Sequence, residues 1–242
     1  MIVYIKRGIG GEIGNPNFYA AYDGFHQMGF EIRYFQHTKE LTEHRPEDLV
    51  VGYVNDVRRV LGQHGIVTPE MDYPEELSAY MGRRVWKTTL SAVANNPDSW
   101  GIFVKPVEDK KFTGVVVHGT KDLVGCGTYG EDPEVFCSDV VKFVAEWRCF
   151  VRYGRILDVR PYRGDWRMHF DPSVLEEMVE RFASAPKGYS LDIGLTDQGQ
   201  TLLIEVNDGY ALGHYGLNTL DYAKLLSARW SELTGQSDEC DF

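Results

Sequence analysis

The sequence predicts an α/β (α+β) fold in which a short α/β layer precedes a larger part built from antiparallel sheets. In residues 2–65, apolar strand-like runs alternate with amphipathic helical stretches. From residue 100 onward, strand-like runs follow one another through short turns, and one helical stretch interrupts them. The chain has 242 residues, of which 43% are hydrophobic, so it can bury a substantial core in one or two domains.

The N-terminal part repeats a strand–helix unit. Residues 2–5 have the pattern of a strand, and residues 15–29 that of a helix that Asn-Pro opens and glycine closes. A second strand at 30–35, a third at 47–54 and a helix at 55–65 follow. This β-α-β start predicts a small α/β layer.

The rest of the chain changes from a helical to a strand-like pattern. Helical stretches are expected at 74–82 and 85–96. Further strands and helices are expected within 100–107, 112–119, 140–164 and 190–207 (strands) and at 172–184 and 219–235 (helices). The acidic residues 236–242 are expected to be disordered.

Charge and composition exclude several classes of function. The net charge of −11, from 25 Lys and Arg against 36 Asp and Glu, argues against sequence-independent binding of nucleic acid, which relies on a basic surface. The apolar N-terminal stretch is too short for a signal peptide, and no run of about 18 apolar residues occurs, so we expect a cytoplasmic protein without a membrane partner. The four cysteines show no CxxC spacing and are expected to be free thiols. Composition leaves the oligomeric state open.

A glycine-rich loop, RGIGGEIG at 7–14, follows the first strand. Ile13 stands where the dinucleotide-binding fingerprint requires its third glycine, so that fingerprint is absent. Two interpretations stay open. The segment is either a flexible loop or a loop that faces a substrate, because α/β sheets bind ligands at the carboxyl ends of their strands.

Three oxygen-bearing side chains gather in the hairpin predicted at 190–207. Glu205 and Asn207 point to the same face of their strand, because side chains on a strand alternate with period two. Asp192, on the paired strand, can lie opposite them. Two carboxylates and an amide suit Mg²⁺, which completes its shell with water and phosphate oxygens. A chance acidic strand end is the alternative.

Charged residues earlier in the chain favour the metal interpretation. Lys105 ends a strongly apolar strand, where a lone charge is costly unless it meets an anion. A polar loop, DKKFTG at 109–114, follows, and Glu146 and Arg148 alternate on a later strand. With this order of residues, the chain resembles the ATP-grasp superfamily.

Two segments carry the resemblance. AEWRCFVRYGRILD is similar to a strand of ligases that add amino acids to protein or peptide termini, and LLIEVN is similar to the superfamily's metal-binding strand. The chain resembles a small clade known as a domain of unknown function. The resemblance implies a pre-ATP-grasp α/β domain at 1–75, an ATP-grasp domain with antiparallel sheets at 76–235, and an acidic tail at 236–242.

The resemblance also assigns roles to single residues. Lys105 is expected to hold the α and β phosphates of ATP, and the 109–114 loop, with Lys111, to close over the triphosphate. Adenine and ribose are expected to meet the backbone of Asp139, Val140 and Val141 and the side chain of Glu146. Mg²⁺ is expected on Asp192, Glu205 and Asn207. A second basic contact to the nucleotide is expected from Arg83, Arg84 or Lys87, among which the sequence does not decide.

The implied activity is that of an ATP- and Mg-dependent ligase, which joins a small-molecule or peptide carboxylate to an amine through an acyl phosphate. Many amide-forming relatives carry an arginine two residues before the first metal aspartate, where this chain has Ser190. Arg148 is then the cation expected to face the γ-phosphate, and catalytic roles are expected for Arg148 and Lys105. A small-molecule kinase and a non-catalytic nucleotide-binding domain remain alternatives.

The substrate side is less defined. In residues 209–218, Tyr210, His214 and Tyr215 are either walls of an acceptor pocket or parts of a packed glycine turn. The arginines of the segment VRPYRGDWRM either receive a carboxylate, which arginine binds bidentately, or form a solvated face; they are Arg160, Arg163 and Arg167.

Overall fold

A three-stranded parallel sheet opens the chain. The central strand β1 (Ile2–Lys6) is flanked by β2 (Glu31–Phe35) and β3 (Leu49–Val51), both parallel to it. Helix α1 (Pro16–Gln27) connects β1 to β2, and α2 (Val54–Gln63) follows β3. The predicted strand–helix repeat is therefore confirmed.

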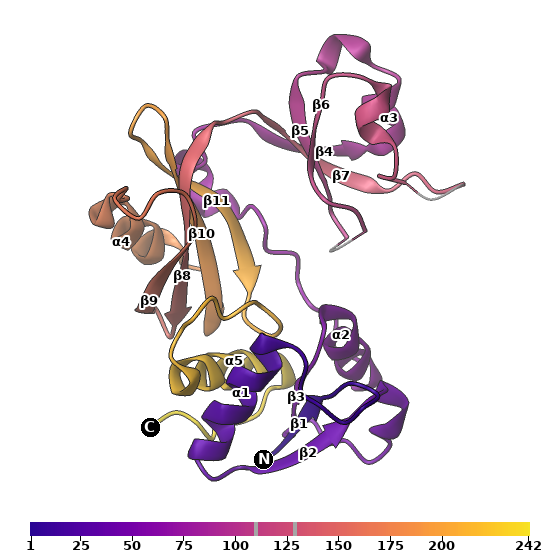
Figure 1. The fold of residues 1–242 in the computed structure, drawn as a ribbon, viewed down its shortest axis with the longest axis vertical. Coiled ribbons are helices and arrows are strands. Elements are labelled where there is room, and N and C mark those ends of the chain that lie inside the picture. Colours follow the sequence, from indigo (N-terminus) through magenta and orange to yellow (C-terminus); the bar gives the residue numbers. More distant parts are fainter. Residues whose placement is uncertain (109–110, 128–129) are drawn as a thin grey trace. The chain divides into compact units, whose positions relative to one another are not determined.

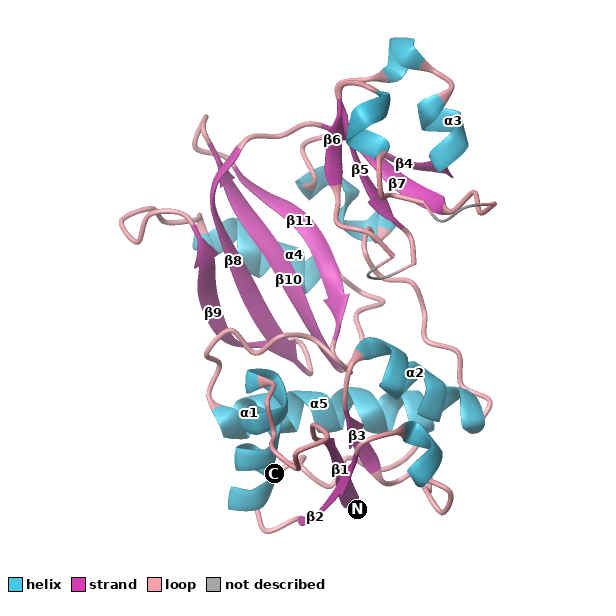
Figure 2. Ribbon diagram, turned by 45° about the vertical axis from the view of Figure 1, so that its right-hand side comes forward, coloured by secondary structure: helices cyan, strands magenta, loops and turns pink. Residues whose placement is uncertain are grey.

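The second sheet has four strands in the order β11-β10-β8-β9. Its strands are β8 (Phe143–Arg152), β9 (Arg155–Arg163), β10 (Gly188–Thr196) and β11 (Thr201–Asp208). The pairs β8–β9 and β10–β11 are antiparallel hairpins, as predicted. We call this sheet the central sheet. Figure 2 shows helix α4 (Pro172–Arg181) behind it, so one face is covered by a helix.

Helix α5 (Thr219–Thr234) packs against α1 and ends at Gly235, which adopts the left-handed conformation with φ of 68°. The segment after it is held in place. Asp238 accepts hydrogen bonds from Arg152 Nη2 and the Tyr153 hydroxyl, each at 2.9 Å, and Cys240 is fully buried. The expectation of disorder in 236–242 was wrong, because these contacts compensate the acidic charge of the segment.

A third sheet, in the order β4-β7-β5-β6, is antiparallel throughout. Its strands are β4 (Val85–Thr89), β5 (Ile102–Pro106), β6 (Val115–Val117) and β7 (Glu134–Asp139). One face packs on a small apolar core with the short helix α3 (Leu90–Ala94). We call this sheet the small sheet.

Two element predictions need correction here. Residues 85–89 are a strand and not the start of a helix, because VWKTT is rich in β-branched and aromatic residues and pairs along β7. The helix expected at 74–82 is the 3₁₀ helix η2 (Glu75–Tyr80). The remaining 3₁₀ turns are η1 (Thr38–Glu40), η3 (Pro97–Ser99) and η4 (Thr120–Leu123).

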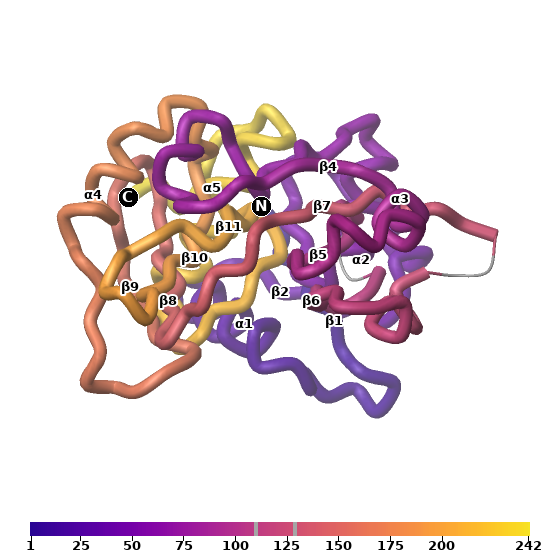
Figure 3. The backbone as a smooth tube through the Cα atoms, turned by 90° about the horizontal axis from the view of Figure 1, so that it is seen from above, coloured from indigo at the N-terminus to yellow at the C-terminus, as the bar shows by residue number. Residues whose placement is uncertain are grey.

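This computed structural model describes residues 1–108, 111–127 and 130–242 (Figure 1). The chain divides into two compact units, Met1–Tyr80 with Val144–Phe242, and Met81–Phe143. Figure 3 follows the chain from the first unit through the second and back again. The predicted mixed α/β fold with antiparallel sheets is confirmed. No helix in the described part of the chain is long and apolar enough to cross a membrane, and the four cysteines are free and buried.

Candidate functional site

The three predicted metal ligands lie on one face of the central sheet. Asp192 on β10 is paired with Glu205 on β11, and Ser190 is paired with Asn207. Residues two apart on a strand share a face, so these four side chains form two adjacent rows. The opposite face carries apolar residues such as Tyr189, whose ring meets Phe182 after α4 at 5.4 Å between centroids.

Arg148 on β8 joins this polar face through a two-point ion pair. Its Nε donates to Asp192 Oδ1 and its Nη2 to Asp192 Oδ2, each at 2.7 Å. The pair is buried, with 7% of Arg148 and 4% of Asp192 exposed. We expected Asp192 to face solvent, and this expectation was wrong: the carboxylate is an interior group neutralised by a guanidinium.

Burial and pairing have opposite effects on the two groups. Burial raises the pKa of Asp192, and the hydrogen bonds from Arg148 act in the other direction without cancelling it. Burial alone lowers the pKa of Arg148, but its hydrogen bonds to Asp192 outweigh this and raise it above the ordinary value. Arg148 therefore stays charged, and either partner alone would be a costly buried group.

Beside the ion pair, two buried polar atoms lack partners. Ser190 Oγ and Asn207 Nδ2 make no hydrogen bond with any residue in the described ranges. Such atoms are uncommon in a folded protein and call for a ligand, a water or a strain explanation. They occupy the row next to Asp192 and Glu205, which is consistent with a polar ligand at this face.

The donor set fits Mg²⁺ only as an incomplete site. No three His, Cys, Asp or Glu side chains converge anywhere in the described chain. Glu205, Asn207 and the already paired Asp192 supply two carboxylates and one amide. Mg²⁺ commonly takes one or two carboxylates and fills its shell with phosphate oxygens and water, so this set is sufficient for a metal that arrives with a nucleotide.

Tyr215 covers the guanidinium of Arg148. Its ring centroid lies 4.7 Å from Arg148 Cζ and 5.3 Å from the ring of Tyr162 on β9. Tyr215 has a φ of 43°, which is unusual for a residue other than glycine. A Cβ at Gly213 would lie only 3.1 Å from the Tyr215 ring, so glycine is needed there. Tyr215 was named from the sequence as one possible wall residue; Tyr162 was missed.

The other two residues of that loop serve the interior. Tyr210 is buried, and its hydroxyl accepts a hydrogen bond from Arg58 Nε at 2.7 Å. The backbone N–H of His214 donates to Asn17 Oδ1 at 3.0 Å, and burial lowers the pKa of its imidazole. For these two residues the packed-turn interpretation describes what is seen.

Glu146 lies at the start of the same polar face. It is paired in register with Arg163 on β9, and the two side chains form an ion pair. The nearby charges of Asp192 and Glu146, together with burial as the main cause, raise the pKa of Tyr162, so its hydroxyl stays protonated.

On the small sheet, two predicted lysines flank one aromatic ring. Lys87 on β4 and Lys105 on β5 are each paired in register with Phe136 on β7. Their Nζ atoms lie 5.0 and 5.7 Å from the centroid of the Phe136 ring, within the range of cation–π attraction. Phe136 was not predicted, because residues 134–139 were not recognised as a strand.

The remaining predicted nucleotide contacts also lie in the small unit. Arg84 donates to Asp139 through Nη2 at 2.8 Å and Nε at 3.0 Å, and Arg83 donates to the Met81 carbonyl at 2.9 Å. Asp139 ends β7, and Val140, which follows it, is half exposed beside Val141.

Lys111 is the described cation of the predicted 109–114 loop. It forms ion pairs with Glu131 at 2.8 Å and Glu108 at 3.4 Å. Residues 109–110 of the loop lie outside the described residues, so the expected closure over a triphosphate stays a prediction.

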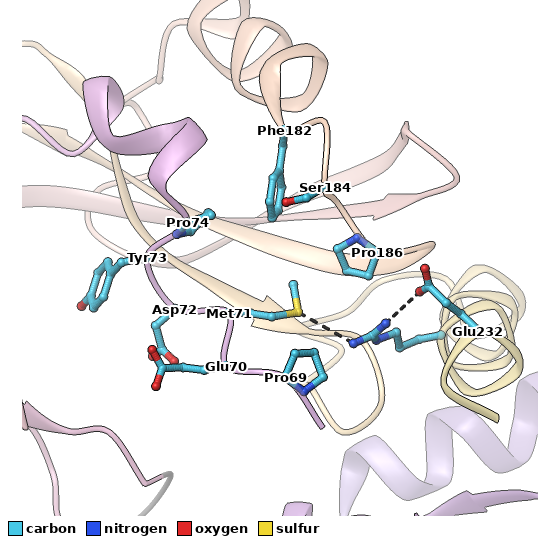
Figure 4. Close-up of a pocket in the computed structure, with 11 residues that line it drawn as sticks. Pro69, Glu70, Met71, Asp72, Tyr73, Pro74, Phe182, Ser184, Pro186 and Glu232 are labelled. Carbon is cyan, nitrogen blue, oxygen red and sulfur yellow. Dashed lines mark hydrogen bonds and ion pairs between the residues drawn. The ribbon is translucent and has the colours of Figure 1, made fainter. Parts of the chain in front are cut away.

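A cavity of about 260 Å³ lies between residues 69–74, the segment after α4, and α5 (Figure 4). Arg229 in its wall is already bound to both oxygens of Asp208 at 2.6 Å and to Glu232 at 2.8 Å. Figure 4 shows Met71 and Glu232 on either side of this guanidinium. The predicted site residues do not line this cavity, and we assign it no role in the site.

The structure resembles solved ATP-grasp enzymes. D-alanine–D-alanine ligase from Bacillus anthracis, solved with ATP, aligns over 97% of this chain and 96% of its own, with a TM-score of 0.59 and 14% identity. The ATP-grasp ligase PsnB, solved with a minimal precursor, aligns over 96% and 99%, with a TM-score of 0.55 and 14% identity. N5-carboxyaminoimidazole synthetase from Staphylococcus aureus aligns over 99% and 78%, with a TM-score of 0.58 and 10% identity. At these identities the likeness establishes the fold.

The sequence comparisons supply the family. No curated protein matches the chain at significant similarity. A family model that describes an ATP-grasp domain, the second family of its clade, matches residues 80–225. This match spans more than half of the chain and includes the central-sheet site and both lysines beside Phe136. The chain therefore belongs to this family of ATP-grasp domains, and the resemblance stated from its sequence is confirmed.

Proposed function

We propose that the protein is an ATP- and Mg-dependent carboxylate–amine ligase that forms an amide or peptide bond through an acyl phosphate. Family membership and fold support an ATP-dependent ligase. The observation that carries the finer proposal is the polar face of the central sheet. Asp192, Glu205 and Asn207 lie there in register, next to a guanidinium and to unpartnered buried donors.

In this proposal, Glu205 and Asn207 hold Mg²⁺, with Asp192 as the third oxygen ligand. The metal supplies neutralisation of phosphate charge and a template for the phosphates when it is bound. Asp192 already has a hydrogen bond at each oxygen, so Arg148 fixes its orientation, as second partners of metal ligands commonly do. The same pair keeps a positive charge next to the metal site.

On the small sheet, we propose that Lys105 binds the phosphates of ATP and that Lys87 or Arg84 adds a second cationic contact. Both lysines lie on the sheet face opposite the apolar core, on either side of Phe136. Asp139, Val140 and Val141 are proposed to meet adenine through backbone groups, Glu146 to meet the ribose, and Lys111 to belong to the covering loop.

The chain's part in the reaction is positioning and charge neutralisation. A substrate carboxylate attacks the γ-phosphorus, the β–γ bridging oxygen leaves with ADP, and an acyl phosphate forms. An amine then adds to the acyl carbon, phosphate leaves with its bonding electrons, and the amine loses a proton. No side-chain nucleophile takes part, so catalysis depends on holding the reactants together and on fixed cations at the developing charge.

The proposal is tested by measuring ADP release with Mg²⁺ and a panel of amino acids and dipeptides, followed by mass spectrometry of the products. The ligase predicts ADP formation that requires both a carboxylate and an amine, and a condensed product. With a carboxylate that carries isotope-labelled oxygen, one label must appear in the released phosphate. ADP formation with a stable phosphorylated product and no amine requirement would instead show a kinase, and ATP binding without turnover across the panel would contradict both.

A further inference from the structure

The polar face of the central sheet carries a second arginine beside Arg148. Arg160 on β9 is directly opposite Arg148 on β8. Like charges directly opposite one another across two strands are destabilising unless each is compensated. Arg148 is compensated by both oxygens of Asp192. The compensation of Arg160 is less complete.

Arg160 keeps half of one hydrogen-bonding edge unused. Its Nη2 lies 2.6 Å from Asp158 Oδ2. Its Nε is buried, and none of the residues at 1–108, 111–127 or 130–242 accepts a hydrogen bond from it. A buried N–H without a partner costs free energy, and a ligand that accepts from it removes that cost.

The neighbouring strand shows which chemical group fits this edge. In Arg148, the same two nitrogens, Nε and Nη2, meet the two oxygens of one carboxylate at 2.7 Å. Nη2 of Arg160 carries two hydrogens, so it can keep Asp158 and still share a second carboxylate with Nε. The planar fork of arginine matches the two oxygens of a carboxylate.

The position of Arg160 also limits the size of the ligand. From β9, the carboxylates at Asp192 and Glu205 are two and three strands away in the sheet order. Strands lie about 4.8 Å apart, so these distances are about 10 to 14 Å. A single amino acid does not span this length, whereas three or four extended residues at about 3.4 Å each do.

We propose that Arg160 anchors a carboxylate of a peptide-sized acidic substrate, apart from the group that reacts near the metal ligands. Tyr162, which shares the strand face of Arg160, and Tyr215 have rings 5.3 Å apart and offer an apolar wall for the chain of that substrate. This inference rests on the proposed ligase function and names its substrate class: a peptide with an acidic side chain or a free C-terminal carboxylate.

Calorimetry without ATP or Mg²⁺ tests the anchor apart from the reaction. The probes are acetyl-Ala-Glu-Ala-amide, its glutamine counterpart and inorganic phosphate. We expect the glutamate peptide to bind at least about tenfold more tightly than the glutamine peptide, because one charge-assisted hydrogen-bonded pair is lost. Equal binding of the two peptides, or no binding of either, would overturn the proposal, and displacement by phosphate would replace a carboxylate anchor with a general oxyanion site.

Variants separate binding from a structural role. Arg160→Gln should abolish the preference for glutamate, and Arg160→Lys should keep only part of it, since the charge remains but the fork does not. Asp158→Asn frees Nη2 of Arg160 and should tighten binding, whereas a merely structural ion pair predicts weaker binding. Arg155→Gln, exposed at the other end of β9, is the matched control and should bind like the unchanged protein. Because ADP release is measured separately, a failed ligase assay and a failed anchor are distinguishable.

Discussion

Each of the two four-stranded sheets holds an Arg–Asp pair with two hydrogen bonds, and the two pairs lie in opposite environments. Arg148 and Asp192 on the central sheet are buried, with side chains 8% and 5% exposed. Arg84 and Asp139 on the small sheet are 80% and 40% exposed. The same chemistry therefore shifts the two carboxyl groups in opposite directions: burial raises the pKa of Asp192, and Arg84 lowers the pKa of Asp139.

The comparison separates charges that the fold depends on from charges that it can lose. A buried pair is costly to break because the remaining partner is left uncompensated in the interior. An exposed pair is screened by water and salt and contributes little. The polar face of the central sheet is thus part of the folded core as well as the candidate site, whereas the small sheet presents its cations at the surface of its own unit.

The largest expected effect comes from breaking the buried pair. Asp192→Ala leaves Arg148 uncompensated and should lower the free energy of unfolding by about 3–5 kcal/mol. Urea unfolding followed by circular dichroism measures it. Replacing both residues, with Arg148→Met and Asp192→Leu together, should restore much of the loss. A loss below about 1 kcal/mol in the single variant would mean that the pair is not buried in solution.

Lys105 tests the opposite case on the small sheet. Lys105→Met should change the free energy of unfolding by less than about 1 kcal/mol, because it removes a charge from a partly exposed face. It should weaken ATP binding about tenfold or more, through loss of a charge-assisted contact to phosphate. Lys121→Met, an exposed lysine on η4 of the same unit, is the control for general charge effects. Equal affinities in the two variants would contradict the assigned role of Lys105.

Buried thiols report how each sheet opens. Cys137 on β7 and Cys149 on β8 are fully buried, which raises their pKa values to about 11 and about 12. Neither thiol should be alkylated at pH near 7.5 in the native protein, because a protonated thiol is a poor nucleophile. In increasing urea, Cys137 should react before Cys149, since the unit Met81–Phe143 has the smaller core. Site-resolved mass spectrometry of iodoacetamide labelling decides the order, and simultaneous labelling would show one cooperative transition.

The smallest effect is expected for the exposed pair. Because Arg84 lowers the pKa of Asp139, the pair contributes stability above the ordinary carboxyl pKa of about 4, and this contribution is lost as the pH falls through the lowered value. Asp139→Asn should therefore be slightly less stable than the unchanged protein at neutral pH and equal to it in strong acid or at high salt. Thermal unfolding at pH 7 and pH 3 measures the difference. A difference that persists in strong acid would assign it to packing.

Local patterns predicted the parts of the site that lie on one hairpin. Period-two alternation placed Glu205 and Asn207 on one face, and the adjacent strand brought Asp192 opposite them, as found in the register of β10 and β11. The ion pair of Asp192 with Arg148 was not predictable in this way. It depends on β8 lying beside β10, which is a non-local choice of strand order.

The small sheet shows why other features were missed. The segment 85–96 combines a strand with a five-residue helix, so a helical pattern in its second half concealed β4. Without β4 and β7, the arrangement of Lys87 and Lys105 around Phe136 had no basis in the sequence. Likewise, the orphaned Nε of Arg160 depends on burial by other strands and is invisible in a single segment.

The central claim is that the polar face of the central sheet holds the metal-bound nucleotide. The most direct test is the rate of Mg-dependent ADP formation by Glu205→Gln, compared with Asp197→Asn in the turn between β10 and β11. Each variant removes one negative charge from the same hairpin. The account predicts that Glu205→Gln loses about 10²-fold or more in rate while folding normally, and that Asp197→Asn keeps the full rate. Equal rates in the two variants, at saturating Mg²⁺ and ATP, would contradict it.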